Sequence, residues 1–202
     1  PFIGVANLAS DVTPCNVHLT RIAESVKEGL WDSQSVPFMF GTITISDGIS
    51  MGTEGMKGSL VSREVIADSI ETVCFTEGMD GLVVVAACDK NMPGAMMSMA
   101  RLNIPSVFVY GGAILPGNYG GRDINIQDMY EAVGAFSKCQ LTLDELTNME
   151  RVACPGEGAC SGMFTANTMA SAIEAMGMSI PGAASIPAVD GRTLDVAKEA
   201  GK

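Results

Sequence analysis

The sequence predicts an α/β fold: a parallel sheet flanked by helices, followed by a mainly helical subdomain. Short apolar runs rich in Val and Ile alternate with segments whose apolar residues recur at helical spacing, an order typical of parallel sheets. The run Leu82–Ala87 is apolar throughout, as expected of a strand that helices cover on both faces. The 202 residues, 47% of them hydrophobic, suffice for one large domain or two small ones.

The first part of the chain, roughly residues 1–115, contains all the expected strands. Thr42–Ile45 shows β-branched alternation, which indicates a strand. A helix is expected from Ser62, a suitable N-cap residue with Glu64 in the first turn, to Phe75. The other expected strands are Phe2–Ala6, Leu82–Ala87 and Ser106–Tyr110, and the other expected helices are Val17–Leu30 and Pro93–Leu102.

The second part, roughly residues 116–202, is expected to be mainly helical. It begins with the Gly-rich loop Pro116–Arg122. A helix over Gln127–Lys138 follows, and Thr142 opens the next one, which ends at Arg151, with a capping box to Glu145. The last clear helical pattern covers Cys160–Met178. We treat residues 1–202 as one N-terminal domain, divided into two parts near residue 116.

Composition excludes several classes of function. The net charge of −11 would repel phosphate backbones, which argues against a nucleic-acid partner. No apolar run is long enough to cross a bilayer, and Pro1–Ala9 lacks the pattern of a signal peptide. Because the chain begins with Pro, we treat it as a fragment or a processed product. The six cysteines form no C-x-x-C pair, and a Gly-rich α/β chain favours a cytoplasmic protein without disulfides, or an organellar one in a eukaryote.

Reactive side chains follow several of the expected strands. Asp47 comes after Thr42–Ile45, and Cys88, Asp89 and Lys90 come after Leu82–Ala87. Cys15 follows the first strand, and Gly111-Gly112 closes the last, where a ligand could approach the backbone closely. Because ligands of open α/β sheets bind beyond the carboxyl ends of the strands, these segments predict a site there.

The residue types in this predicted site suit metal ions. Asp47 and Asp89 would provide hard oxygen ligands for Mg²⁺, whereas nearby cysteines would provide soft ligands for iron–sulfur or zinc. Taken singly, each residue also has an ordinary interpretation. Asp47 fits a turn before Gly48, Cys88 fits a small buried hydrophobic residue, and Lys90 fits a solvated surface.

The other cysteines and the single histidine also allow more than one interpretation. Cys160 would lie at the mouth of a helix over residues 163–176, where the helix dipole favours a thiolate, or it would simply be buried. Cys74 fits the apolar face of its helix and is expected in the core. His18 lies on a helix near Cys15, and we expect it to make a structural hydrogen bond rather than to act as a base.

Six sequence blocks resemble the dihydroxy-acid dehydratases, which belong to the dihydroxy-acid and phosphogluconate dehydratase superfamily. Together the blocks cover essentially the whole chain, in the family's order and at compatible spacing. They are "PCNVHL" (Pro14–Leu19), "SDGISMG" (Ser46–Gly52), "SLVSREVIADSIE" (Ser59–Glu71), "CDKNMPG" (Cys88–Gly94), "RLNIPSVFVYGG" (Arg101–Gly112) and "GACSGMFTANTM" (Gly158–Met169).

The resemblance implies a role for each metal-binding candidate. It implies three thiolate ligands of an iron–sulfur cluster, which leave one iron position open. Some relatives carry glycine where this chain has Cys15, so its presence favours a [2Fe–2S] cluster over a [4Fe–4S] cluster. The residue that matches the family's carbamylated lysine, which binds Mg²⁺ as a carboxylate, is Lys90. The implied cluster ligands are Cys15, Cys88 and Cys160, and the implied Mg²⁺ ligands are Asp47, Asp89 and Lys90.

By the same resemblance, the protein would dehydrate 2,3-dihydroxy-3-methyl carboxylic acids to 2-oxo acids in valine and isoleucine biosynthesis. Family members are more than twice as long, homodimeric, and carry their proposed base, a serine, in a C-terminal domain absent here. We therefore expect this chain alone to be inactive. One alternative is a sugar-acid dehydratase of the same superfamily, acting on 6-phosphogluconate or an aldonate. Another is a non-catalytic metal-binding module, with zinc at the cysteines.

Overall fold

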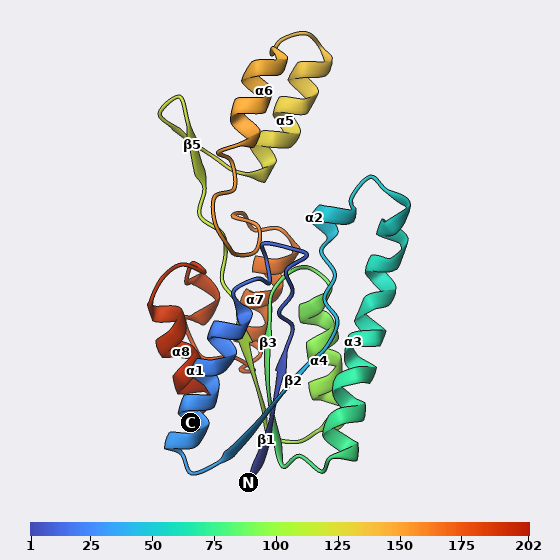
Figure 1. Cartoon of the computed structure of the whole chain (residues 1–202), viewed down its shortest axis with the longest axis vertical. Helices are drawn as coiled ribbons and strands as arrows, with labels where there is room; N and C mark the ends of the chain where they lie inside the picture. The colour runs from blue at the N-terminus through green and yellow to red at the C-terminus, as the bar shows by residue number, and fades with distance from the viewer.

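A four-stranded parallel sheet lies at the centre of the molecule, and the computed structural model describes it with all of residues 1–202. The strand order is β2-β1-β3-β4, so the chain passes from β2 over β1 to reach β3. All strands run in one direction, and their carboxyl ends therefore meet at one edge of the sheet (Figure 1). The strands are β1 (Phe2–Asn7), β2 (Val36–Gly41), β3 (Gly81–Ala86) and β4 (Ser106–Tyr110).

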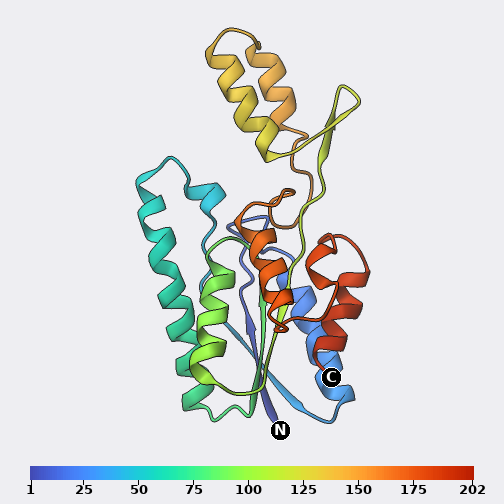
Figure 2. The same ribbon diagram turned by 180° about the vertical axis from the view of Figure 1, so that it is seen from behind.

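Helices cover both faces of this sheet, as Figures 1 and 2 show. On one face lie α1 (Leu19–Asp32) and α8 (Arg192–Ala200), and on the other lie α3 (Lys57–Thr76) and α4 (Asn91–Leu102). The main core contains 29 buried residues from the sheet and these helices. None of the helices is long and apolar enough to cross a lipid bilayer. The predicted α/β class, with a parallel sheet flanked by helices, is confirmed.

The second strand lies earlier in the chain than predicted. The strand expected at Thr42–Ile45 does not form, and β2 instead pairs with β1 from Phe2↔Val36 to Asn7↔Gly41. Pro37 lies within β2, which made this segment look unlike a strand. Because β2 is an edge strand, the missing N–H of a proline can be tolerated there. Residues 42–46 then leave the sheet and lead to the short helix α2 (Asp47–Ser50).

Two helices begin at residues other than those predicted. Ser62 is not an N-cap, because α3 already begins at Lys57 after the 3₁₀ turn Glu54–Met56, which Thr53 caps. The last predicted helix, expected from Cys160, begins as α7 (Thr165–Ala175). Before α7, Ala159 makes a parallel β-bridge with Ala113, and residues 161–164 form bends instead of a helix.

The second half of the chain forms a projecting part, from β5 (Gly117–Tyr119) to α6 (Leu143–Glu150), and a part that packs beside the sheet, from α7 to α8. A hairpin of β5 and β6 (Arg122–Ile124) precedes the helical pair α5 (Ile126–Ser137) and α6, and these elements project beyond the carboxyl edge of the sheet (Figure 1). They share a small core of five buried residues. The predicted capping box between Thr142 and Glu145 is present at the start of α6. The chain then returns, and α7, the 3₁₀ turn η2 (Ala183–Ser185) and α8 lie beside the sheet.

Candidate metal centre

A cavity of about 360 Å³ lies at the carboxyl edge of the sheet, below the projecting helices. Its walls come from segments that are far apart in the sequence, including the loop after β1, the start of α2 and the turn after β3. Of the six predicted metal ligands, only Lys90 does not line the cavity, and it contacts one that does. The predicted ligands in the wall are Cys15, Asp47, Cys88, Asp89 and Cys160, joined by a fourth cysteine, Cys154.

Backbone hydrogen bonds hold the two cysteine-bearing loops together. The N–H of Gly158 donates to the carbonyl of Pro14 over 2.9 Å, which joins the loop of Cys160 to the loop of Cys15. Ala159 donates to the carbonyl of Gly112 over 2.9 Å and accepts from Ile114 over 2.6 Å. The Cys160 loop is therefore attached both to the Cys15 loop and to the segment that continues β4.

Cys88 occupies a backbone conformation that is uncommon for a residue with a side chain. Its φ of 68° lies in the left-handed region, and the residue is only 4% exposed. Such a conformation costs free energy and persists only where the surrounding structure imposes it, which occurs most often at functional sites. The sharp turn at the end of β3 places Cys88 and Asp89 in the cavity wall, and Lys90 follows beside Asp47.

The three thiols differ in acidity because they interact. The neighbouring Cys88 thiol lowers the pKa of Cys15 despite the burial of Cys15. The same interaction, together with burial, raises the pKa of Cys88. Burial and the nearby Asp89 and Cys88 raise the pKa of Cys160 to about 11. Of the two interpretations of Cys160, the structure favours burial over a helix mouth, because α7 begins five residues later and desolvation raises the pKa of this thiol.

The two aspartates have opposite shifts. Burial raises the pKa of Asp47, but hydrogen bonds from Lys90 and Ser59 outweigh it and hold this pKa below its usual value. The Lys90 Nζ atom lies 2.5 Å from Asp47 Oδ2 and 3.9 Å from Asp89 Oδ2. Burial and the neighbouring Asp47 raise the pKa of Asp89. Negative charge is thus concentrated on Asp47, with the Lys90 ammonium group beside both carboxyl groups.

Asn91 connects the two segments that carry the carboxyl groups, and the sequence analysis did not single it out. It is fully buried at the start of α4. Its side-chain amide donates to the hydroxyl of Thr44 and accepts from the N–H of Ile45 over 3.1 Å. Its place within "CDKNMPG", directly after the candidate ligands, was the only signal in the sequence.

Other predicted residues have structural roles. His18 makes the expected structural hydrogen bond, with its Nε2 atom 2.7 Å from the carbonyl oxygen of Gly111. Cys74 lies in the core as expected, where burial raises its pKa to about 11. Gly111 and Gly112, which were expected to let a ligand approach the backbone, pack closely against other parts of the chain. A Cβ atom on Gly111 would collide with Leu19, and one on Gly112 would collide with the backbone of Ala188.

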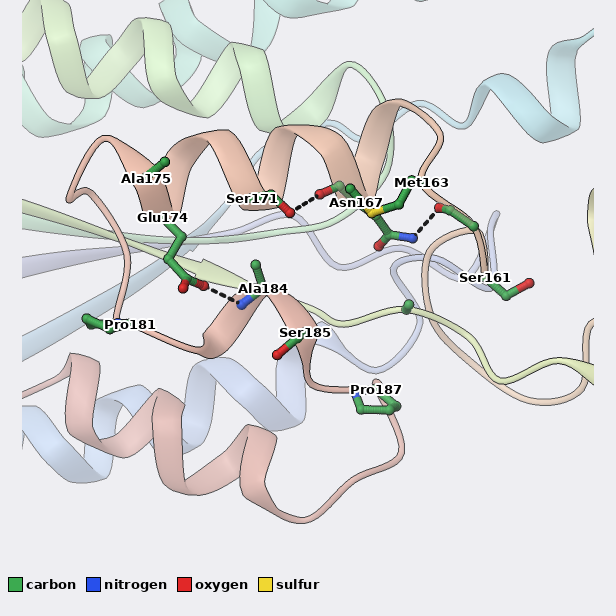
Figure 3. A pocket seen from close by; sticks show the side chains of 12 residues that line it. Ser161, Met163, Asn167, Ser171, Glu174, Ala175, Pro181, Ala184, Ser185 and Pro187 are labelled. Atoms are coloured by element: carbon green, nitrogen blue, oxygen red, sulfur yellow. Dashed lines mark hydrogen bonds between the residues drawn. The ribbon is translucent and has the colours of Figure 1, made fainter.

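A larger cavity of about 580 Å³ lies on the other side of the loop that follows Cys160, between α7 and η2 (Figure 3). No cysteine or aspartate lines it. Its one acidic side chain, Glu174, accepts hydrogen bonds from the backbone N–H groups of Gly182 and Ala184 over 2.7 and 2.9 Å. That carboxylate therefore holds η2 in place. The thiols and aspartates that could bind metals line only the smaller cavity.

The donor set contains soft thiols, which suit an iron–sulfur cluster, and hard carboxyl groups, which suit Mg²⁺. No group of three His, Cys, Asp or Glu side chains is arranged to hold one metal ion. A cluster contains several metal atoms and takes ligands from a wider area, so three thiols around one cavity suit it. The two carboxyl groups would suit Mg²⁺, but the Lys90 ammonium group already lies beside them as the local cation. A Mg²⁺ ion at these carboxyl groups would compete with the Lys90 ammonium group.

The fold and this cavity define an α/β domain with thiols and carboxyl groups gathered at the carboxyl edge of its parallel sheet. The family model described as dihydroxy-acid/6-phosphogluconate dehydratase N-terminal matches residues 1–202. The chain belongs to this family of hydro-lyases, which confirms the resemblance noted in the sequence.

Full-length relatives agree with this assignment. The chain is 57% identical over 202 residues to the dihydroxy-acid dehydratase of Synechocystis sp., and 58% identical over 202 residues to that of Natronomonas pharaonis. The dihydroxy-acid dehydratase of Haloarcula marismortui is 56% identical over the same length. These matches cover 100% of this chain but 36%, 34% and 35% of the three relatives. The chain thus spans about a third of their length.

Proposed function

We propose that the protein containing this chain is a dihydroxy-acid dehydratase. It would remove water from 2,3-dihydroxy-3-methyl carboxylic acids to give 2-oxo acids, as in valine and isoleucine biosynthesis. The observation that carries the proposal is the meeting of three thiols and two carboxyl groups at one cavity. The support from sequence is that dihydroxy-acid dehydratases are 56–58% identical to the whole chain.

Two metal groups are part of this proposal. Cys15, Cys88 and Cys160 would hold an iron–sulfur cluster, with [2Fe–2S] favoured over [4Fe–4S]. The Mg²⁺ ligands would be Asp47, Asp89 and Lys90, with Lys90 carbamylated so that its ammonium group is replaced by a carboxylate. When bound, these groups would supply a Lewis acid for the departing C3 hydroxyl and positive charge for the substrate carboxylate.

The rest of the cavity wall suits a branched, uncharged carbon chain. Its apolar residues could contact the substrate methyl groups and exclude water from the reacting carbons. No Lys or Arg of this chain lines the cavity, so the only cation for a substrate phosphate would be the proposed Mg²⁺, which the substrate carboxylate would already occupy. This favours the branched-chain substrate over 6-phosphogluconate, the second candidate. The apolar residues are Ile49, Met51, Ile114, Ile126 and Phe164.

The base that removes the C2 proton is proposed to lie outside this chain. Dehydration removes a proton from C2 and hydroxide from C3, and the resulting enol takes up a proton to become the 2-oxo acid. The cavity contains no histidine or lysine, and its two aspartates are assigned to Mg²⁺. As the resemblance to the dehydratases implies, the base would come from the part of the relatives that this chain does not span, and we propose that the chain alone is inactive.

The proposal can be tested on the full-length protein purified without oxygen. We expect the visible absorption of an iron–sulfur cluster, an electron paramagnetic resonance (EPR) signal after reduction with dithionite, and turnover of 2,3-dihydroxyisovalerate far faster than turnover of 6-phosphogluconate. Cys15→Ser, Cys88→Ser and Cys160→Ser should each abolish the chromophore, whereas the matched control Cys74→Ser should retain it. A colourless protein with stoichiometric zinc would instead support a non-catalytic metal-binding module.

A further inference from the structure

We propose that Tyr110 and Asn167 are positioning residues, which as a hydrogen-bonded pair fix the Cys160 thiol relative to Cys88 and Cys15. Neither residue was a candidate in the sequence. The inference rests on the proposed function, because it assigns these two side chains to the geometry of the proposed iron–sulfur centre.

Asn167 holds the backbone on both sides of Ser161. Its side-chain Nδ2 donates to the carbonyl of Cys160 over 2.6 Å and also to the carbonyl of Gly162. Figure 3 shows this side chain reaching from α7 toward the loop. Because an amide nitrogen has two hydrogens and both are used here, the orientation of the amide group is fixed. The Oδ1 atom must therefore face the other way, toward Tyr110.

Tyr110 completes the arrangement from the sheet. Its hydroxyl donates to Oδ1 of Asn167, and this is the one orientation that the fixed amide permits. The residue ends β4 and pairs with Ala86 of β3, the strand that leads directly to Cys88. It is only 4% exposed. Burial, followed by the charges of Cys15, Cys160 and Cys88, raises its pKa, so the phenol stays protonated and able to donate.

The Cys160 loop needs such a support. Residues 154–164 form neither a helix nor a named strand, and Gly156 and Gly158 have positive φ angles. Backbone bonds hold the loop at Gly158 and Ala159, before the cysteine. The Asn167 amide holds it at Cys160 itself and after it. Buried polar groups that all have hydrogen-bond partners hold one geometry more strictly than apolar contacts do, although burying them costs desolvation free energy.

The test uses two substitutions in the full-length protein and one matched control. Tyr110→Phe removes a single hydroxyl and keeps the ring. Asn167→Asp keeps an acceptor for Tyr110 but loses both donations to the loop. The control, Ser171→Ala, removes a 3.0 Å hydrogen bond to the backbone carbonyl of Asn167 on the same helix.

We expect both variants to bind a cluster after anaerobic reconstitution but to lose it about tenfold faster to a ferrous-iron chelator. Their EPR g values should shift, because the Cys160 ligand is displaced, whereas Ser171→Ala should keep the wild-type spectrum and rate. A merely structural role would destabilise the fold without changing the spectrum.

Two results would overturn the inference. If Tyr110→Phe and Asn167→Asp keep the wild-type spectrum and chelation rate, the pair does not position the ligand, while the proposed function stands. If the wild-type protein itself takes up no iron–sulfur cluster, both the proposed function and this inference fail. If Asn167→Asp does not fold, the EPR spectrum and chelation rate of the milder variant, Tyr110→Phe, test the inference alone.

Discussion

The Nζ atom of Lys90 lies 2.5 Å from Oδ2 of Asp47, although 43 positions separate the two residues in the sequence. The Lys90 side chain is 20% exposed and that of Asp47 only 6%. A largely desolvated ion pair is a weak contributor to stability, because desolvation offsets much of the attraction. Its position beside Asp89, at the edge of a thiol-lined cavity, favours a role in the chemistry of the site.

Lys90→Arg should separate the charge of this residue from its capacity for modification. Arginine keeps the cation beside Asp47 but would not form the carbamate that the proposed Mg²⁺ site requires. We expect the fold to be retained and Mg²⁺ affinity to fall at least about 100-fold, since loss of a charged ligand at such a site costs several kcal/mol. Binding of Mn²⁺ as a spectroscopic substitute, measured with and without bicarbonate, checks this. Lys57→Arg, at the exposed ion pair with Glu54, is the control, and wild-type affinity in Lys90→Arg would contradict the proposal.

Asn91→Ala should destabilise the fold by about 2–3 kcal/mol. The substitution leaves the N–H of Ile45 and the hydroxyl of Thr44, both half-buried, without the partner that the fully buried Asn91 provides. Urea denaturation at neutral pH measures the effect. Asn118→Ala is the matched control, because Asn118 makes its side-chain bonds with Asp123 and Gly121 in an exposed hairpin, and its loss should cost less than about 0.5 kcal/mol. Equal losses in the two variants would mean that Asn91 does not hold the site together.

The sequence was informative where burial dictates residue type. A strand covered on both faces must be apolar along its whole length, so β3 could be recognised from Leu82–Ala87. An edge strand is under no such demand, and β2, with Pro37 inside it, escaped recognition. The position of the site could likewise be predicted only in part. The carboxyl ends of parallel strands share one edge, so the sequence was enough to expect Asp47 and Cys88 at one cavity. The strand expected directly before Asp47 does not form, and β2 ends earlier, at Gly41.

The connections within the site could not be predicted in this way. Asn91 and Asn167 are polar residues near helix starts, a place where asparagine commonly caps a helix. That each instead binds a distant segment depends on the tertiary packing, which no local pattern encodes. The raised pKa of Cys160, where a helix dipole would have lowered it, also depends on tertiary packing. A helix dipole can be inferred from a glycine-rich helix entry, but the desolvation that outweighs it depends on the full cavity.

Cysteine alkylation should report the burial of the thiols. Cys139 is exposed, whereas Cys74 is 2% exposed and has a pKa raised to about 11 by burial. Because the thiolate is the reactive form, iodoacetamide at pH 8 should modify Cys139 in the native metal-free protein at least about 100-fold faster than Cys74. Mass spectrometry of digested samples over time measures both rates, and in urea the two should become similar. Fast modification of Cys74 in the native protein would contradict the placement of this helix face in the core.

Acidification should destabilise the domain through His18. Burial lowers the pKa of His18 below its usual value of 6.5, although its bond to Gly111 and the charge of Glu157 act in the opposite direction. Below pH 6.5 the unfolded chain binds a proton at this histidine and the folded chain does not, so the free energy of unfolding falls as the pH drops toward the folded pKa. Above pH 6.5 both states are neutral there and this contribution is constant.

The variant His18→Gln isolates this effect, because glutamine can donate to the Gly111 carbonyl but does not titrate. Urea denaturation of both proteins between pH 7.5 and pH 5 should show a steeper loss of stability in the wild type, with the difference growing only below pH 6.5. Acidic groups such as Asp89 titrate in both proteins, so the comparison cancels them. Parallel pH profiles for the two proteins would show that His18 is as accessible to protons in the folded state as in the unfolded chain.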